Sequence, residues 1–227
     1  RLAIALQIAN KKVVAFSYIE PVQSFFDNYG RATAWLLLCL IGLYRISDIV
    51  LGVISNVFYQ DLGYSKEEIA SAVKIFGLAM AIGGGFLGGI MSMRHGVMRM
   101  LFVGAVLVVL TNLLFISLLY SGHNMWVLYA VVAADNLVAG LASAAFIAFL
   151  SSLVDVRFTA MQYAIFSSLM TLIPKVLGGY SGSIVDSVGY QTFFLIAAAM
   201  GLPVLWLIYK AGGSLTMVKP SLLPVCR

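Results

Sequence analysis

Apolar residues fall into six long runs along the chain, and short polar or glycine-containing stretches separate the runs. A helix needs about 20 predominantly apolar residues to cross a bilayer. Each run reaches that length, so the pattern predicts six transmembrane helices. We expect them over residues 34–59, 69–91, 100–120, 125–150, 159–184 and 190–209. The predicted fold class is therefore an all-α integral membrane protein with one six-helix bundle at residues 34–209.

Two segments flank the predicted bundle. Residues 1–33 mix charged and apolar positions, which predicts a linker. Pro21 and the adjacent Phe25 and Phe26 equally allow a short interfacial helix, because proline is tolerated in a first helical turn and aromatic rings can lie at the headgroups. Residues 210–227 form a polar tail that we expect to be disordered. Since the chain begins without an initiator methionine, we expect it to be a fragment of a longer protein.

Local signals describe the second and third helices more closely. Ser65 is followed three residues later by Glu68, a capping box that predicts a helix start just after Ser65. The third helix has no charged residue, so we expect it to lie mostly at the periphery of the bundle. The second helix carries glycines at spacings that let helix backbones approach closely: Gly77, Gly84, Gly85, Gly88 and Gly89.

The composition agrees with a membrane protein. Hydrophobic residues make up 62% of the chain and charged residues 10%, whereas a soluble domain carries about 25% charged residues. The net charge of +5 does not indicate nucleic-acid binding, because the basic residues lie in short loops between apolar runs. Only Lys66 falls on one side of a six-span topology, so the positive-inside rule places both ends of the chain in the cytoplasm. Ten basic residues fall on the other side: Arg1, Lys11, Lys12, Arg31, Arg94, Arg99, Arg157, Lys210, Lys219 and Arg227.

The first predicted helix carries two ionisable residues near its middle, Arg45 and Asp48. An ionised group at the centre of a bilayer costs at least about 2.5–3.5 kcal/mol, so such residues usually face a bundle interior or a water-filled cavity. Their spacing puts both on one helix face. The stripe favours the wall of a transport pathway over the alternative, a structural Arg–Asp pair that ties this helix to a neighbour. Small and polar residues continue the same face: Gly52, Ser55, Asn56 and Tyr59.

The loop between the second and third helices carries a motif. Residues 88–99 read GGIMSMRHGVMR, which resembles the loop signature of the major facilitator superfamily, Gly-x-x-x-Asp-Arg-x-Gly-Arg. Met93 stands at the Asp position, a departure that fits the copy in the second half of such carriers. An ordinary basic turn is the alternative. The resemblance implies a cytoplasmic gate at Gly89, Arg94, Gly96 and Arg99.

A second stretch extends this resemblance. Residues 178–190, GGYSGSIVDSVGY, are similar to the glycine-rich end of the superfamily's eleventh helix and its following loop. Together with six spans and a preceding linker, they imply the C-terminal half of a twelve-helix major facilitator carrier, a fold built from two parallel halves. The implied partners are the N-terminal six-helix half of the same carrier and the lipid bilayer.

A narrower resemblance covers residues 43–79, where LYRISDIVLGVISNVFYQDLGYSKEEIASAVKIFGLA looks like the muropeptide permease family, AmpG. Glu20, Pro21, Phe25 and Phe26 are similar to that family's linker before its seventh helix. The resemblance implies a carrier of the bacterial inner membrane that imports anhydro-muropeptides, the sugar-peptides of cell-wall recycling, from periplasm to cytoplasm. It also implies coupling to protons, so that the proton gradient supplies the energy for transport and no cofactor is needed. Carriers for acetyl-CoA are more distantly similar and are the alternative.

A muropeptide presents hydroxyls, amides and carboxylates, so its binding requires polar side chains and positive charge in a wet cavity. Lys175 follows Pro174, where loss of a backbone hydrogen bond predicts a bend that can line a cavity; a lysine that snorkels to the interface is the alternative. The predicted substrate-binding residues are Arg45, Asn56, Asn136, Gln162 and Lys175.

A coupled proton requires an acid within the membrane, and Asp48 and Asp135 are the two candidates. Asp135 precedes Asn136, so a hydrogen bond between helices is an equal alternative for that position. The two cysteines, Cys39 and Cys226, have no metal-ligand spacing around them, and no metal site is expected.

Two other classes of protein fit the sequence less well. A membrane-embedded transferase needs a reactive cluster, but His95 and His123 fall in loops on opposite sides of the predicted topology. A channel or scaffold subunit would gather charge in one ring, whereas here charged residues are spread over several spans. The sequence therefore favours a secondary transporter.

Overall fold

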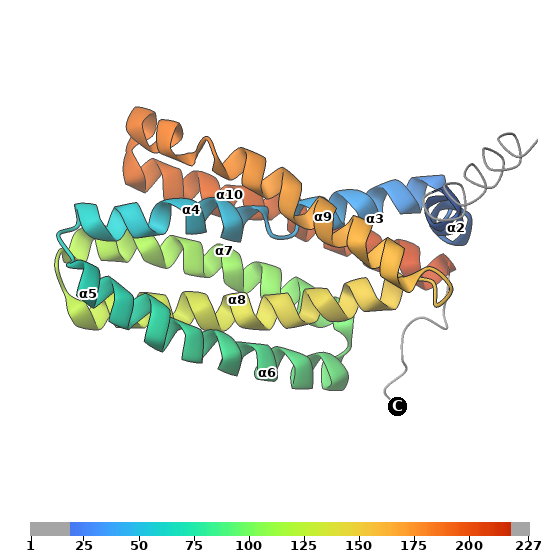
Figure 1. Ribbon diagram of the computed structural model, residues 1–227, viewed down its shortest axis with the longest axis horizontal. Helices are drawn as coiled ribbons and strands as arrows, with labels where there is room; N and C mark the ends of the chain where they lie inside the picture. The colour runs from blue at the N-terminus through green and yellow to red at the C-terminus, as the bar shows by residue number, and fades with distance from the viewer. Residues whose placement is uncertain (1–18, 219–227) are drawn as a thin grey trace, which may run out of the picture.

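The computed structural model describes residues 19–218, which form helices joined by short turns, with no strand among them (Figure 1). In chain order the helices are α2 (Glu20–Tyr29), α3 (Arg31–Leu43), α4 (Ile46–Asp61), α5 (Lys66–Ile69), η2 (Ala70–Gly77), α6 (Leu78–His95), α7 (Val97–Ser121), α8 (Met125–Leu153), α9 (Thr159–Gly178) and α10 (Ser181–Val218). The prediction of an all-α protein with six spans is confirmed. Six segments are long and apolar enough to cross a membrane: Arg31–Asp61, Lys66–His95, Val97–Ser121, Met125–Leu153, Thr159–Gly178 and Ser181–Leu215.

The ends of the spans differ from the predicted ends by a few residues. The first span starts at Arg31 rather than at residue 34, and α10 continues as helix into the segment predicted as a disordered tail. That prediction is wrong for residues 210–218, because Ala211 and Leu215 continue the buried face of α10. The rest of the tail and most of the predicted linker, residues 219–227 and 1–18, lie outside the described residues.

The spans run back and forth along the long axis of the molecule (Figure 1). The α4–α5 turn, the α7–α8 turn and the kink of α10 lie at one end, whereas α2 and the α6–α7 and α8–α9 turns lie at the other. The kink is at Gly189, whose φ of 77° and ψ of 165° suit a residue without a side chain. It divides α10 into an arm at 181–188 and a long helix at 190–218, so the chain reverses between the predicted fifth and sixth spans.

Two spans are interrupted inside the bundle. The first breaks at Tyr44–Arg45, between α3 and α4, and the fifth breaks after α9, before the arm of α10. At the second break, Ser181 is fully buried and donates a hydrogen bond of 3.3 Å to the Val50 carbonyl of α4. A side chain thus ties one interrupted span to the other.

The second span begins where its capping box predicts. The Ser65 hydroxyl accepts a hydrogen bond from the Glu68 amide at 3.2 Å, and the Glu68 carboxylate accepts one from the Ser65 amide at 2.8 Å. The span then includes η2, a π-helix of eight residues that the sequence pattern did not predict. Such wide turns inside α-helices often mark functional positions.

Glycines bring α6 and α8 into direct backbone contact. A Cβ atom added at Gly84 or Gly88 would overlap the backbone of α8 at Leu137 or Leu141. The contact is reciprocal, because a Cβ at Gly140 of α8 would overlap the backbone of α6. The predicted close approach is therefore confirmed for these positions of α6. The backbone of Gly85 is part of this contact with Gly140, although a Cβ added at Gly85 itself, or at Gly89, would meet nothing within 4 Å.

The third span, α7, is not peripheral as the sequence predicted. It packs against α8, α10 and α4, and its polar residues Thr111 and Asn112 are buried together with Phe115 and Leu118. Only its outer side, which includes Leu110 and Leu114, is exposed. The prediction took the absence of charged residues as a sign of a peripheral helix. It failed because this helix makes its buried contacts with uncharged polar groups.

Neighbouring glycines of α6 allow a matched test of this packing. We expect Gly84→Ala to lower the stability of the full-length protein by about 1–3 kcal/mol, because the added methyl group would overlap rigid backbone. Thermal unfolding in detergent measures the effect. Gly83→Ala is the control, since nothing lies within 4 Å of a Cβ there, and equal loss in both variants would contradict the proposed contact.

Candidate functional site

Arg45 and Asp48 form an ion pair at the start of α4, with 2.6 Å between the Arg45 Nη2 and Asp48 Oδ2 atoms. The two side chains keep 28% and 21% of their surface exposed. The pair is therefore neither in the core nor in open solvent. The prediction that the two residues share one helix face is confirmed.

The ion pair lies at the interruption of the first span. Arg45 is the N-cap residue of α4, with φ of −98° and ψ of 9°. On the other flank, the Tyr44 hydroxyl donates to the Leu101 carbonyl at 3.2 Å and its ring stacks on Phe146. Non-helical backbone at membrane depth is tolerated where protein buries it or where it lines a wet cavity. Here Tyr44 buries one flank, and the charged pair occupies the other.

Asp135 of α8 joins this pair. Its carboxylate is close enough to Asp48 to interact with it electrostatically, and it lies beside the hydroxyl of Thr111. Tyr59 is a further neighbour of Asp135. Two carboxylates and one guanidinium from two spans therefore share one partly buried site.

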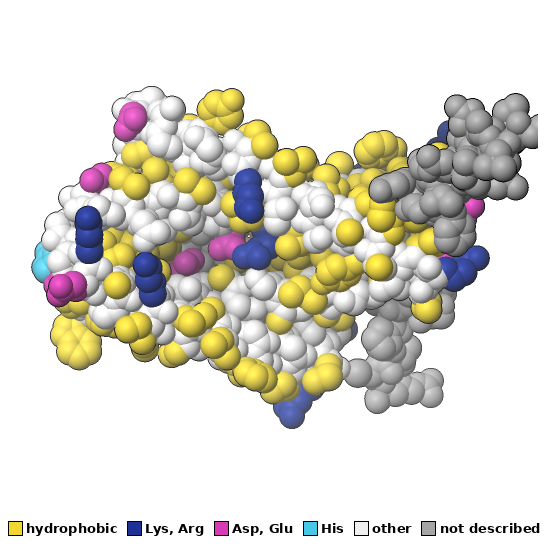
Figure 2. Space-filling view, in the orientation of Figure 1, with side chains coloured by type: hydrophobic (Ala, Val, Ile, Leu, Met, Phe, Trp, Pro, Cys, Tyr) yellow, Lys and Arg dark blue, Asp and Glu magenta, His cyan; other side chains and the backbone are white. Residues whose placement is uncertain are grey.

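Figure 2 shows acidic and basic side chains near the middle of one face, away from both ends of the molecule. Figure 1 has the same orientation and shows that α4, α8 and α9 form this part of the face. Hydrophobic side chains surround these charges in Figure 2. The charged groups thus form a local polar site on an otherwise apolar surface at mid-depth.

The stripe predicted along the first helix divides in the structure. Gly52 and Asn56 are exposed and Ser55 is half-buried, as expected for residues that line the wall of a pathway. Tyr59 is only 3% exposed and packs against Phe115 inside the bundle. The stripe therefore does not continue to Tyr59 as predicted, because Tyr59 faces the interior of the bundle.

Asn136 faces a different neighbour from Asp135. Its side-chain amide donates to the Val132 carbonyl of its own helix at 2.9 Å and packs against Gly77 of η2. The structure therefore gives Asn136 a role in helix packing, rather than the predicted place among the substrate-binding residues.

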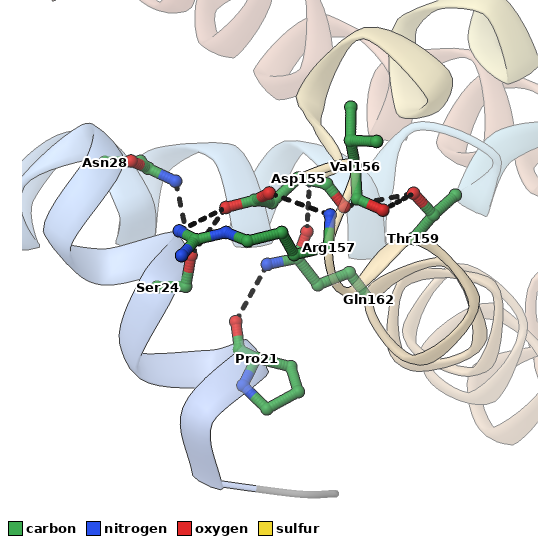
Figure 3. A network of polar contacts seen from close by, with 8 residues as sticks. All are labelled: Pro21, Ser24, Asn28, Asp155, Val156, Arg157, Thr159 and Gln162. Atoms are coloured by element: carbon green, nitrogen blue, oxygen red, sulfur yellow. Dashed lines mark hydrogen bonds and ion pairs between the residues drawn. The ribbon is translucent and has the colours of Figure 1, made fainter. Parts of the chain in front are cut away.

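Gln162 also differs from its predicted place. It is 2% exposed, its amide nitrogen donates to the Pro21 carbonyl at 2.8 Å, and its amide oxygen accepts from the Asp155 amide at 2.7 Å. Figure 3 shows both bonds at the junction of α2 with the α8–α9 turn. With both ends of its amide occupied, Gln162 joins structural elements, and we remove it from the candidate substrate-binding residues.

The same junction holds α2 against the bundle. Ser24 donates to the Asp155 carboxylate at 3.0 Å, and Tyr29 donates to the Leu153 carbonyl at 3.1 Å. Phe25 is buried and its ring lies 5.1 Å from that of Phe166. Of the two alternatives for this segment, linker and short interfacial helix, the structure has a helix, but Phe25 packs into the bundle rather than at the lipid headgroups.

Lys175 is exposed on α9, on the same helix as the second interruption. Pro174 lies inside α9, which continues as helix to Gly178. A Cβ at Gly178 would lie 3.1 Å from Val53, so α9 packs closely on α4 at this point. Lys175 therefore stands beside the helix that carries the ion pair.

A groove of about 670 Å³ lies between α3 and α9. It ends at Ile173, within one turn of Lys175, and includes Cys39 of α3. Its lining is otherwise mostly apolar. The lining residues are Trp35, Leu38, Cys39, Met161, Ala164, Ile165, Ser168, Leu169, Leu172 and Ile173.

The predicted gate residues lie at the α6–α7 turn. Gly96 makes the turn with φ of 87° and ψ of 144°. Arg94 and Arg99 are exposed, and neither forms an ion pair with another described residue. Gly89 lines a shallow groove on the outer side of α6. Among residues 19–218, no group of His, Cys, Asp and Glu has a geometry that could hold a metal ion.

Two buried polar residues that the sequence analysis did not select adjoin the ion pair. Ser47 lies in the same turn of α4, and Asn112 of α7 donates a hydrogen bond to its hydroxyl. Only one signal in the sequence could have found Asn112, namely that it is an amide inside an otherwise apolar span.

Comparison with known protein families decides the class of this fold. The model of the Major Facilitator Superfamily matches residues 32–219, which include all six spans. The chain belongs to the Major Facilitator Superfamily. It is therefore a multi-pass membrane protein, and its six helices correspond to half of the superfamily fold.

Individual relatives agree with this result. The chain is 31% identical over 193 residues to "Putative transporter AmpG 4" of Rickettsia conorii, covering 85% of the chain and 47% of that relative. It is 35% identical over 175 residues to "Putative transporter AmpG 1" of Rickettsia bellii, covering 77% and 43%. An "Uncharacterized protein" of Haemophilus influenzae is 35% identical over 190 residues, covering 81% and 45%. The chain thus spans about half the length of the curated relatives it matches.

The junction at α2 gives a testable pH dependence. Hydrogen bonds from the Arg157 backbone amide and side chain, with a further one from Ser24, lower the pKa of Asp155 to about 2. Because the folded pKa is below the ordinary value, this contribution is fully present above about pH 4 and is lost as the pH falls towards 2. We expect Asp155→Asn to speed amide hydrogen exchange of α2 severalfold at pH 7.

Asp27→Asn is the matched control, since Asp27 is an exposed acid on α2 itself. Hydrogen-exchange mass spectrometry of the segment 20–29 compares the two variants. Equal exchange rates in the wild type and Asp155→Asn would contradict the role of this carboxylate.

Proposed function

We propose that the full-length protein is a proton-coupled carrier that imports anhydro-muropeptides from the periplasm to the cytoplasm by alternating access. The observation that carries this proposal is the partly exposed Arg45–Asp48 pair with Asp135 beside it, at an interruption of the first span. The two relatives named as AmpG transporters support the substrate class.

Coupling requires one group whose proton affinity differs between two global states of the carrier. Asp48 is our candidate for this group, because it pairs with Arg45 at 2.6 Å at the interruption of the first span and lies near Asp135 of α8. A change in its distance from Arg45 or from Asp135 would change the charges around this acid. Opening and closing of the bundle would then load and unload a proton, with the gradient as the energy source and no cofactor.

The substrate would meet this site through its carboxylates and its neutral polar groups. Arg45 and Lys175 offer positive charge from two neighbouring helices, and Asn56 is an exposed amide further along α4. The apolar groove between α3 and α9 leads from the region of Lys175 towards the end of the bundle that holds α2. These features support a path between the charged site and the cytoplasmic end.

The N-terminal half of the carrier would complete the pathway. The relatives are about twice as long as this chain, and α6 leaves several large apolar residues exposed that a second half could cover. Gly89, Arg94, Gly96 and Arg99 would act as the cytoplasmic gate, since the α6–α7 turn is at the same end as α2. The exposed residues of this side include Ile82, Phe86, Leu87, Ile90 and Met93.

The decisive experiment is uptake of labelled anhydro-muropeptide into vesicles that contain the full-length protein, with and without a proton gradient. We expect Asp48→Asn to reduce gradient-driven accumulation to the level seen without a gradient, because the amide keeps the shape but cannot titrate. Substrate exchange without a gradient should survive.

Asp135→Asn is the comparison variant, expected to be milder if Asp48 carries the proton. Full proton-driven uptake by Asp48→Asn, together with an inactive Asp135→Asn, would move the coupling role to α8. Absence of gradient-driven uptake by the wild type would refute the proposed function itself.

Orientation in the inner membrane is tested separately by reporter fusions. We expect fusions after Gly63 and Gly122 to report the periplasm, and fusions after His95 and Lys210 to report the cytoplasm. The reason is that most of the basic residues between the spans lie at the end of the bundle with the α6–α7 and α8–α9 turns. A cytoplasmic signal at Gly122 would contradict the proposed orientation.

A further inference from the structure

Ser47 and Asn112 hold the interrupted span against its neighbours. Ser47 lies between Arg45 and Asp48 in the first turn of α4 and is 2% exposed. Its hydroxyl donates to the Ala197 carbonyl of α10 and accepts from the side-chain amide of Asn112 on α7, each at 2.5 Å. Three spans therefore meet at one hydroxyl group, directly beside the ion pair.

The helix α7 contacts the surroundings of both acids through consecutive residues. Thr111 lies beside Asp135 of α8, and the next residue, Asn112, bonds to Ser47, the neighbour of Asp48. Consecutive residues of a regular helix keep a fixed separation. The position of Asp48 relative to Asp135 is therefore set by α7, as long as the bond between Ser47 and Asn112 is intact.

The hydrogen bonding of this pair is incomplete. Asn112 is 1% exposed, and its Oδ1 atom has no hydrogen-bond partner among the residues that the structure describes. A buried acceptor without a partner destabilises a fold, and replacing both partners by apolar groups of the same shape can be neutral or stabilising. Stability alone therefore explains this polar pair poorly, whereas a need to place the neighbouring charges explains it directly.

We propose that Ser47 and Asn112 are positioning residues that fix the Arg45–Asp48 pair relative to Asp135. This inference rests on the proposed carrier function. Without the bond, the first turn of α4 moves more freely and the Asp48 carboxylate loses its fixed contact with Arg45. The charged and titratable groups around the acids are Arg45, Tyr44 and Tyr59 of the first span, Asp135 of α8 and, on the same face, Lys175 of α9.

An infrared pH titration of carboxyl groups in the purified full-length protein tests the proposal, with Asp48→Asn identifying the signal of that residue. We expect Ser47→Ala and Asn112→Leu each to change the midpoint of the Asp48 titration by ~0.5 unit or more, because the carboxylate no longer keeps fixed distances from Arg45 and Asp135. An unchanged midpoint in both variants would overturn the proposal.

Ser181→Ala is the matched control, because Ser181 is also fully buried and its hydroxyl also bonds to α4, at the Val50 carbonyl. We expect it to leave the midpoint unchanged. A shift equal to that of Ser47→Ala would show that loss of any buried hydroxyl that holds α4 has the same effect, and would overturn the specific role of this pair.

The double variant Ser47→Ala with Asn112→Leu separates positioning from packing. We expect its thermal stability to recover relative to the single variants, because both polar partners are gone, while its titration midpoint stays shifted. Recovery of the wild-type midpoint together with stability would show a packing role only. The titration needs no substrate, so its outcome is independent of the uptake assay. Failure of the wild type in the uptake assay would count against the carrier function, whereas an unchanged titration midpoint would count against the positioning role.

Discussion

An arginine and an aspartate placed halfway along an apolar span are the constraint on which the rest of this structure depends. Each charge alone at that depth would cost at least about 2.5–3.5 kcal/mol, so the two must pair, and they do so within one turn of α4. The pair needs side chains that keep some contact with water or with other polar groups. The first span breaks at this point, and Asp135 lies near the pair from the neighbouring helix α8.

The two interrupted spans support each other. A break in a membrane helix frees backbone groups that water cannot reach, and other parts of the protein must satisfy them. Here α9 packs on α3 and α4, with Gly178 close to Val53, and Ser181 bonds to the Val50 carbonyl just beyond its own break. By contrast, α7 is continuous and bonds to both flanks of the first break, through Leu101 on one side and Asn112 on the other. It therefore holds both flanks of the break in place relative to each other.

The order of the helices followed from the sequence, because apolar length alone determines where a chain can cross a bilayer. The pairing of Arg45 with Asp48 followed from their spacing, and the close approach at Gly84 followed from the glycine pattern. Residue type did not reveal which polar residues face the same site. Gln162 and Asn136 have the same chemistry as a binding residue, yet backbone groups at a distant turn and in the same helix use their amides. Such partners are set by tertiary packing, which a single sequence does not encode locally.

The distribution of exposed surface suits the proposal that a second half covers one face of this bundle. The charged site lies on a face bordered by α9 and by the segment α5–α6, and these two are the least buried of the candidate spans. Lipid chains cannot solvate the charges of Arg45 and Asp48, while water would be a poor solvent for exposed Phe86 and Ile82. A face that carries both kinds of surface is satisfied by a protein partner that packs against the apolar borders and encloses water over the charges. The proposed N-terminal half meets both needs, so the same constraint that breaks the first span also determines the surface the other half must bring.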